Sequence, residues 1–286
     1  DKTVVFQVAL LHSFFSRKIL VKKHVFLCFD MQLFKKTSGL KPFYCAHIDR
    51  TSSTNSDLFD WVKKTTCDIP CVLWADHQTA GRGTRGRVWK SPRQSLMFSI
   101  AISLKKTLRN YIGVTLTIGL KIVRFLRLKG INASLKWPND IVVEDRKLAG
   151  ILVENVKNFD GLDTLIIGIG LNLEQADFEL DQYRACAVSD FVDQDWTIES
   201  KTEWLKALVA SVIDAVDEVG DVGLKMTVQE WENVAAYQNE MIDLYVDGEI
   251  VTSAIQHGID ESGRLLVSTP DGICAYLSGT ISLRKK

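Results

Sequence analysis

The chain has 286 residues, of which 46% are hydrophobic and 24% are charged, a composition typical of soluble globular proteins with a large core. Lysine plus arginine and aspartate plus glutamate both number 35, and the resulting zero net charge excludes a broad basic field for non-specific nucleic-acid binding. The longest apolar stretch near the start, residues 4–16, is too short to span a bilayer, so we expect a cytoplasmic protein without a membrane span.

The first segment, residues 1–43, is predicted to be an extension of unclear role. Residues 1–30 are rich in Phe, Val, Leu and Lys without helical or strand periodicity, and the first methionine is Met31. A helix-turn-helix head would need about three helices, and the residues before Ser53 are too few and too irregular to supply them. DNA binding is therefore not expected.

From residue 44 onward the sequence mixes strand and helix patterns. Short apolar runs at 71–75 and 96–102 predict buried strands, and apolar positions at helical spacing predict a helix over 111–128. Two β-rich runs, 147–156 and 162–173, flank a turn-forming Asn-Phe-Asp-Gly segment. They predict a hairpin.

Two further patterns complete the predicted fold. Ser200 and Glu203 stand at capping-box spacing ahead of an amphipathic helix. Five strand candidates, joined by turns that contain Asp and Gly, then follow at 242–246, 249–255, 264–268, 273–277 and 280–284. We therefore predict an α+β fold, with a mixed β-sheet and flanking helices, plus a small all-β barrel at the C-terminus.

The cysteines and histidines indicate no metal or redox chemistry. The six cysteines are scattered without a CxxC pair, and no histidine stands beside them at metal-ligand spacing. This pattern predicts reduced, mostly buried thiols of an intracellular protein. They are Cys28, Cys45, Cys67, Cys71, Cys186 and Cys274.

The segment Gly81-Arg-Gly-Thr-Arg-Gly-Arg87 is the strongest local signal for a binding site. Its glycines allow the backbone to approach a ligand closely, and its arginines supply forked donors suited to carboxylate and phosphate. A solvated basic turn and an Arg-Gly-rich segment for single-stranded nucleic acid are the alternatives. The segment is not a P-loop, because no Gly-Lys-Ser/Thr follows.

A second group of polar residues is Lys136-Trp-Pro-Asn-Asp140, with Lys147 shortly after it. Here a cation ends a strand, proline fixes a turn, and Asp140 is able to bind Mg²⁺ or a ribose. Lys147 begins an apolar strand, where a cation is less expected than on a solvated loop. The alternatives are a well-built turn and a lysine at a hairpin tip.

Five motifs together, in the same order, resemble those of biotin–protein ligases. They are Ser53-Thr-Asn55, Gln78-Thr-Ala-Gly-Arg-Gly-Thr-Arg-Gly-Arg87, Lys136-Trp-Pro-Asn-Asp140, Lys147-Leu-Ala-Gly-Ile-Leu-Val-Glu154 and Gly168-Ile-Gly-Leu-Asn172. The resemblance runs from about residue 44 to the end. It implies a catalytic domain over 44–237 and an SH3-like domain over 238–286.

What the resemblance implies about activity is a ligase that acts in two steps. Biotin and ATP, with Mg²⁺, form biotinyl-5'-AMP, and the biotinyl group then passes to a lysine of a biotin carboxyl carrier domain of a carboxylase. Anionic reactants must approach each other, so Lys147, Arg82 and Arg85 are the expected catalytic cations. An enzyme nucleophile is not needed. A homodimer is compatible with the family.

The resemblance also assigns binding residues, position by position. For biotin it implies Ser53, Thr54, Asn55, Gln78, Gly81, Arg82, Lys147, Gly150 and Gly168. For the nucleotide it implies Arg85, Arg87, Trp89, Lys136, Trp137, Asn139, Asp140, Asn172 and Arg284, with Asp140 also the candidate metal ligand.

Thr84 departs from the family pattern, which usually has arginine there in a loop that orders over the adenylate. A neutral hydroxyl removes one charge-assisted contact, so we expect weaker retention of biotinyl-AMP unless Arg85 substitutes. Three rival functions remain: a lipoate or octanoyl ligase, which would lack the Lys136–Asp140 run; a ligase that is also a repressor; and an RNA-binding protein.

Overall fold

The structure is a computed structural model that describes residues 32–35, 41–66, 68–90, 94–174, 179–180, 183–270 and 272–286. All of these residues belong to one compact unit, Met31–Lys286. Most of the predicted extension, and with it the prediction about DNA binding, lies outside the described residues.

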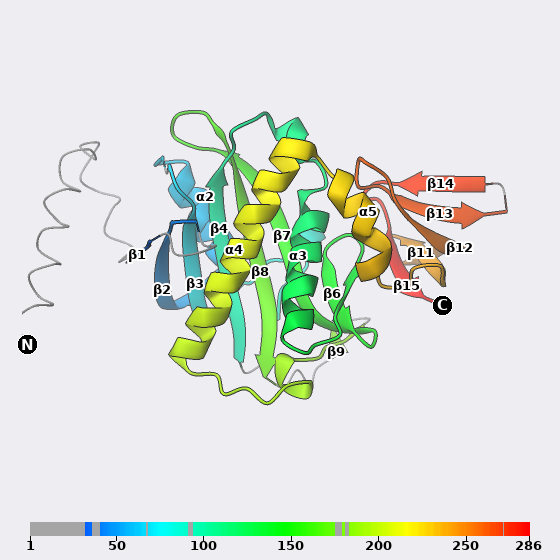
Figure 1. Cartoon of the computed structure of the whole chain (residues 1–286), viewed down its shortest axis with the longest axis horizontal. Coiled ribbons are helices and arrows are strands. Elements are labelled where there is room, and N and C mark those ends of the chain that lie inside the picture. The colour runs from blue at the N-terminus through cyan, green and yellow to red at the C-terminus, as the bar shows by residue number, and fades with distance from the viewer. Residues whose placement is uncertain are drawn as a thin grey trace, which may run out of the picture. The chain divides into compact units, whose positions relative to one another are not determined.

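An eight-stranded sheet forms the centre of this unit, in the order β1-β2-β3-β4-β8-β7-β6-β5 (Figure 1). Its strands are β1 Gln32–Phe34, β2 Phe43–Thr51, β3 Cys71–Gln78, β4 Gln94–Ser103, β5 Ser134–Lys136, β6 Asp140–Val143, β7 Arg146–Lys157 and β8 Asp163–Glu174. Only β2 and β3 pair in parallel; the other neighbours in this sheet are antiparallel. The mixed sheet and the hairpin of β7 and β8 agree with the sequence predictions.

The two faces of the sheet have different coverings because side chains alternate along each strand. Helices α3 (Val114–Leu128) and α4 (Ile198–Val222) lie across one face, where Phe98 and Ile169 join the apolar core (Figure 1). The opposite face carries the side chains of Met97 and Ser99 and the open positions at Gly168 and Gly170. Helix α2 (Thr54–Val62) packs on this second face. That second face bears the candidate site.

Two predicted helices begin at different residues in the structure. The expected helix over 111–128 is divided: a 3₁₀ turn covers Leu108–Tyr111, and α3 starts at Val114, because Gly113 is left-handed with φ 78°. Helix α4 is capped by Thr197, whose hydroxyl accepts from the N–H of Ser200. Ser200 itself is helical, so the predicted capping box lies one turn too late.

The C-terminal strands form a separate five-stranded sheet in the order β14-β13-β12-β11-β15, which confirms the predicted all-β region. Its strands are β11 Met241–Val246, β12 Glu249–Ile259, β13 Leu265–Thr269, β14 Gly272–Tyr276 and β15 Ser282–Lys285. Helix α5 (Lys225–Val234) precedes it, and Trp137 Nε1 donates to the carbonyl of Gly263 at 3.0 Å. The turn at Lys136–Asp140, which joins two strands of the central sheet, therefore also contacts the C-terminal region.

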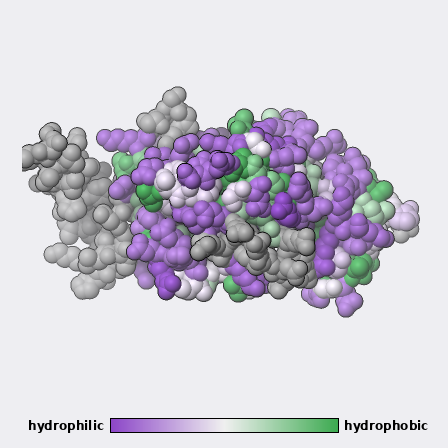
Figure 2. Space-filling model, turned by 90° about the horizontal axis from the view of Figure 1, so that it is seen from below, coloured by the Kyte–Doolittle hydropathy of each residue, from purple (hydrophilic) through white to green (hydrophobic). Residues whose placement is uncertain are grey.

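Apolar side chains are exposed on the outer side of this C-terminal sheet. Met241 pairs with Ile255, Ile255 with Ser268, and Ser268 with Ile273, so these side chains point the same way. The three apolar residues of this row are 41–61% exposed. Figure 2 shows small hydrophobic patches at the right-hand end of the molecule, and others near its middle and left, on a face that is mostly hydrophilic.

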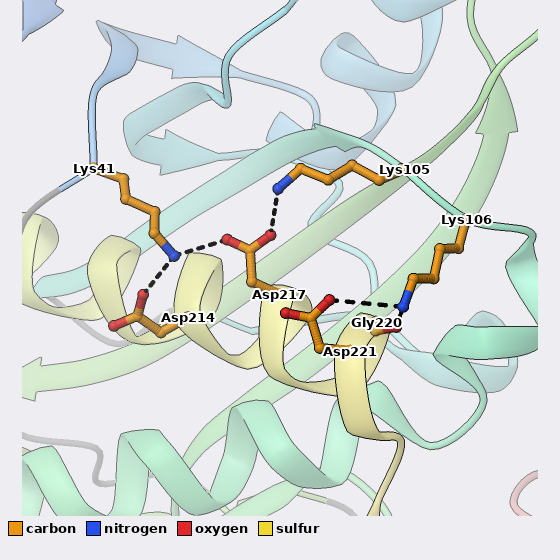
Figure 3. Close-up of polar contacts among 7 residues, drawn as sticks. All are labelled: Lys41, Lys105, Lys106, Asp214, Asp217, Gly220 and Asp221. Carbon is orange, nitrogen blue, oxygen red and sulfur yellow. Dashed lines mark hydrogen bonds and ion pairs between the residues drawn. The ribbon is translucent and has the colours of Figure 1, made fainter.

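Lysines that lie next to strands of the central sheet form ion pairs with aspartates of α4 (Figure 3). Lys41 contacts Asp214 at 3.1 Å and Asp217 at 2.8 Å, while Lys105 contacts Asp217 at 2.9 Å. Burial raises the pKa of Asp217, but hydrogen bonds from both lysines outweigh it and leave the pKa lowered.

We expect Asp217→Asn to lower the free energy of unfolding by about 1 kcal/mol at neutral pH and low salt. The pKa of Asp217 is lowered on folding, so its contribution is present above about pH 4 and is lost as the pH falls further. Urea unfolding at low salt and in about 1 M NaCl measures the effect, which salt should reduce. Asp221→Asn is the control, because Asp221 is 78% exposed and 3.6 Å from its lysine; an equal loss in both variants would contradict the prediction.

The cysteine prediction is wrong at one position. Cys71 is disulfide-bonded, whereas Cys45, Cys186 and Cys274 are free thiols. Burial raises the pKa of Cys45 and Cys186 to about 12, so both are unreactive. Sequence spacing failed here because a disulfide depends on Cα separation in space. Cys28 and Cys67 lie outside the described residues.

None of the helices in the described part of the chain has the length and apolar character of a membrane span.

Candidate active site

The floor of the candidate site is a glycine-containing area of β7 and β8. Gly150 pairs with Gly170, and Gly168 pairs with both Leu152 and Ser99. Glycine leaves space above a sheet that any side chain would fill. This area therefore permits flat groups to lie against the backbone.

Trp89 occupies part of that space. A Cβ added at Gly170 would overlap the indole ring, and one at Gly150 would lie 3.0 Å from it. The ring centroid is 5.5 Å from Lys147 Nζ, and the indole Nε1 is buried without a hydrogen-bond partner among the described residues. Trp89 thus lies between the glycine floor and a cation.

The start of α2 supplies a buried polar row. Ser53 is the N-cap residue, and the backbone N–H of Thr54 donates to Gln78 Oε1 at 2.7 Å. Thr54 Oγ1 lies 2.7 Å from Ser99 Oγ, which donates to Asn55 Oδ1 at 2.5 Å. A Cβ at Gly168 would overlap the Asn55 amide, so glycine there is required for this arrangement.

The glycine–arginine segment folds back on itself above the floor. Arg82 and Val88 form an antiparallel bridge, and the N–H of Gly83 donates to the carbonyl of Arg87 at 2.8 Å. Arg82 Nη2 reaches Glu154 Oε1 at 2.6 Å. Arg85 has φ 59° and points elsewhere, since its Nη2 donates to the carbonyl of Ile281 in the C-terminal sheet at 2.7 Å.

Lys147 and Asp140 form a half-buried ion pair on the other side of the site. Lys147 Nζ lies 2.5 Å from Asp140 Oδ1, and the side chains are 18% and 16% exposed. The pairing follows from the register of β6 and β7, which places Asp140 opposite Gly150 and Val142 opposite Lys147. The ammonium is therefore held beside the glycine floor.

Lys136 lies behind this pair with its amine buried. Burial, and secondarily the nearby charges of Lys147 and Arg284, lower the pKa of Lys136 to about 7, although Asp140 opposes the shift. Its Nζ is 6.0 Å from the centroid of the Tyr237 ring. Near neutral pH, part of the protein population therefore has a neutral Lys136.

We expect the stability difference between Lys136→Met and the wild type to depend on pH. The pKa of Lys136 falls from 10.5 to about 7 on folding, so between these pH values the unfolded chain binds more protons and wild-type stability rises with pH. The advantage of the methionine variant should shrink by roughly 2–3 kcal/mol between pH 7 and 9.5. Urea unfolding at both pH values measures it, and a constant difference would contradict the prediction.

These elements enclose a pocket of about 390 Å³, a volume suited to a small-molecule ligand. It collects many of the residues predicted from the sequence. They are Ser53, Thr54, Asn55, Gln78, Arg82, Arg87, Trp89, Asn139, Asp140, Lys147, Gly150 and Gly168. Among the described lining residues the cations are Arg82, Arg87, Lys90 and Lys147, and Asp140 has the only carboxylate, so the pocket favours anions.

Other predicted residues lie beside the pocket instead of lining it. Gly81 is next to the Trp89 backbone, and Trp137 holds the C-terminal sheet. Asn172 donates to the carbonyls of Lys147 and Cys186 at 3.3 and 3.0 Å, which fixes the start of β7. Arg284 stacks on Tyr245 at 4.1 Å. Arg85 and Lys136 do not line the pocket either.

Some residues of the site were not singled out in the sequence. Gly170 and Lys90 line the pocket, and Phe98 borders it although its side chain also belongs to the apolar core. Ser99 and Glu154 hold Asn55 and Arg82, which line it. Gly170 and Glu154 belong to the motifs that resemble biotin–protein ligases, so their place in the motifs could have indicated them. Ser99 and Phe98 occur in an apolar strand run and carry no local sign of a site.

Comparison with known proteins identifies the two regions separately. Residues 47–172 match the model of the biotin/lipoate A/B protein ligase family, and residues 239–284 match that of the biotin protein ligase C-terminal domain. The first match contains all of the described pocket-lining residues. The second match covers the five-stranded C-terminal sheet except for the last residue of β15.

Individual relatives extend over most of the chain. The bifunctional ligase/repressor BirA of Escherichia coli is 32% identical over 241 residues, covering 81% of this chain and 71% of its own length. The biotin–[acetyl-CoA-carboxylase] ligase of Mycobacterium tuberculosis is 33% identical over 140 residues, 47% of this chain and 51% of its own. The structure of the Aquifex aeolicus biotin protein ligase with biotin and ATP superposes with a TM-score of 0.71 at 29% identity, covering 85% and 99%.

Proposed function

The chain belongs to the biotin–protein ligase family, and we propose that its pocket joins biotin to ATP and then delivers the biotinyl group to a lysine of a carrier domain. The observation that carries the proposal is the cationic pocket over a glycine floor, assembled from the five ordered motifs. The biotin-specific C-terminal match favours biotin over lipoate.

The first step is an attack of the biotin carboxylate on the α-phosphorus of ATP, with pyrophosphate leaving. Both reactants are anions, so the barrier contains a large electrostatic part. Arg82 and Lys147 approach the pocket from opposite sides and would neutralise the carboxylate and the α-phosphate. To do so, Lys147 would exchange its contact with Asp140 for one with the ligand.

The two halves of the pocket suit the two substrates. The buried polar row of Ser53, Thr54, Asn55 and Gln78 offers the hydrogen-bond partners that a ureido ring requires. Trp89 and the turn at Asn139 and Asp140 would bind the nucleotide. In the second step the lysine amine of the acceptor attacks the biotinyl carbonyl and AMP leaves, so the enzyme needs no nucleophile of its own.

Magnesium fits this site only together with the nucleotide. No group of three metal-ligating side chains exists in the described part of the chain, and Asp140 is held by Lys147. Mg²⁺ commonly binds through one or two carboxylates plus substrate phosphates. Asp140 is the residue that would hold it, and the ion would supply charge neutralisation on the phosphates.

The acceptor we propose is the biotin carboxyl carrier domain of a carboxylase, as the name of the Mycobacterium tuberculosis relative suggests. A homodimer, a cytoplasmic location and the lack of DNA binding remain predictions from the sequence.

Transfer to the carrier tests this function directly. The protein is incubated with ATP, biotin, Mg²⁺ and a carrier domain, and the carrier mass is followed. We expect one biotinyl group per carrier and none when the acceptor lysine is replaced by arginine. Modification that proceeds equally well without ATP would contradict the proposal.

Thr84 leads to a prediction about the intermediate. Thr84 lines the pocket, and Arg85 is bonded to the carbonyl of Ile281 instead of replacing the missing arginine. Thr84→Arg should therefore slow release of biotinyl-AMP about tenfold, the effect of one charge-assisted contact. Labelling of a bystander protein in the presence of biotin and ATP measures release. Thr84→Gln is the uncharged control; equal labelling by wild type and both variants would contradict the prediction.

A further inference from the structure

Glu154 connects two parts of the pocket wall. Its Oε2 accepts a hydrogen bond from Asn55 Nδ2 at 2.9 Å, and its Oε1 pairs with Arg82 Nη2 at 2.6 Å. The side chain is 20% exposed and projects from β7 on the same side as Gly150 and Leu152. One carboxylate thus holds both the start of α2 and the glycine–arginine segment.

The contact with Asn55 sets the direction of a longer chain of hydrogen bonds. Because Asn55 donates through Nδ2, its Oδ1 faces Ser99 and accepts the Ser99 hydroxyl proton at 2.5 Å. Ser99 then has only acceptor capacity left for Thr54, 2.7 Å away. Thr54 therefore donates its one hydroxyl proton to Ser99 Oγ and not to Gln78 Oε1, which is farther away at 3.2 Å. Gln78 Oε1 accepts from the backbone N–H of Thr54 at 2.7 Å.

We propose that Glu154 is a positioning residue for the acid substrate: it fixes the orientation of the Asn55 amide and holds Arg82 at the pocket. It thereby determines which donors and acceptors meet the polar end of biotin. This inference rests on the proposed function. A ureido ring presents one acceptor and two donors, so a pocket whose polar row reversed direction would leave buried groups unpaired.

A carboxylate is required here because both of its oxygens accept. Asn55 Nδ2 and Arg82 Nη2 are both donors, and a glutamine has one acceptor oxygen and one donor amide. Glutamine at position 154 would therefore serve one partner and oppose the other. If Asn55 is replaced by aspartate in the same variant, the amide N–H of the glutamine at position 154 donates to the aspartate carboxylate at position 55. The amide oxygen of the glutamine still accepts from Arg82.

The experiment measures KM for biotin and for ATP by pyrophosphate exchange, together with the thermal midpoint, in full-length variants. Glu154→Gln should raise KM for biotin about tenfold and leave KM for ATP within about twofold. The double variant Glu154→Gln/Asn55→Asp should return KM for biotin to within about threefold of wild type. Glu218→Gln is the control, because Glu218 pairs with Lys121 at 2.8 Å with similar exposure on the other face of the sheet.

Wild-type activity separates the two possible failures. If the wild type exchanges pyrophosphate with biotin and Glu154→Gln has the same KM for biotin as the wild type, only this inference is overturned. The same holds for a single variant whose only defect is a lower thermal midpoint, or a double variant as impaired as the single one. A wild type that is inactive with biotin overturns the proposed function and this inference with it.

Discussion

Replacing Lys147 with methionine is expected to lower biotin-dependent pyrophosphate exchange by about 10²–10³-fold, the usual effect of removing one preorganised donor to developing charge. Methionine retains about the length of the aliphatic part of the lysine side chain and lacks the ammonium. The loss should appear mainly in kcat, because the negative charge on the α-phosphate oxygens grows as pyrophosphate leaves.

The matched control for this variant is Lys157→Met on the same strand. Lys157 lies at the far end of β7, where it is 66% exposed and pairs with Asp163 at 3.1 Å. Its replacement should leave exchange unchanged. If Lys147→Met retained more than about a tenth of wild-type kcat, a threshold far above the expected loss, the assigned role would be wrong.

Two alanine substitutions on β8 should separate the two halves of the pocket. A Cβ at Gly168 would overlap the Asn55 amide, and a Cβ at Gly170 would overlap the Trp89 indole. We expect Gly168→Ala to raise KM for biotin, and Gly170→Ala to raise KM for ATP, each by at least about tenfold through displacement of a side chain from its site.

These variants control for each other because they add the same methyl group two residues apart on one strand. Steady-state exchange with either substrate varied supplies all four values of KM. The same increase for both substrates in both variants would indicate general damage to the sheet and would contradict the division into two halves.

Local patterns predicted much of this fold because they depend on neighbouring residues. The hairpin of β7 and β8 and the strands after residue 241 follow from alternation and turn residues, and the structure contains both. The helix starts were harder to predict. Thr197 and Ser200 are both good capping residues, and the choice depends on the loop before α4.

The order of strands in the sheet depends on long-range pairing that no local pattern contains. Strand β4 lies beside β8, and β1 is attached to β2 from within the predicted extension, where Phe34 stacks on Phe43. The disulfide at Cys71 is likewise set by distance in space.

The motifs correctly predicted that many of the candidate site residues lie close together, but they did not predict where the side chains point. Lys147 and Arg82 point to the pocket, whereas Arg85, from the same arginine-rich segment, bonds to the C-terminal sheet. Its left-handed backbone turns the side chain away, and sequence spacing does not reveal this. Ser99 was missed because its importance comes only from its contact with Asn55.

The most direct test of the central claim is ATP–pyrophosphate exchange measured side by side with biotin, lipoate and octanoate. We expect exchange that depends on biotin and is lost in Lys147→Met, with lipoate and octanoate near background. Exchange supported by lipoate or octanoate but not by biotin would contradict it.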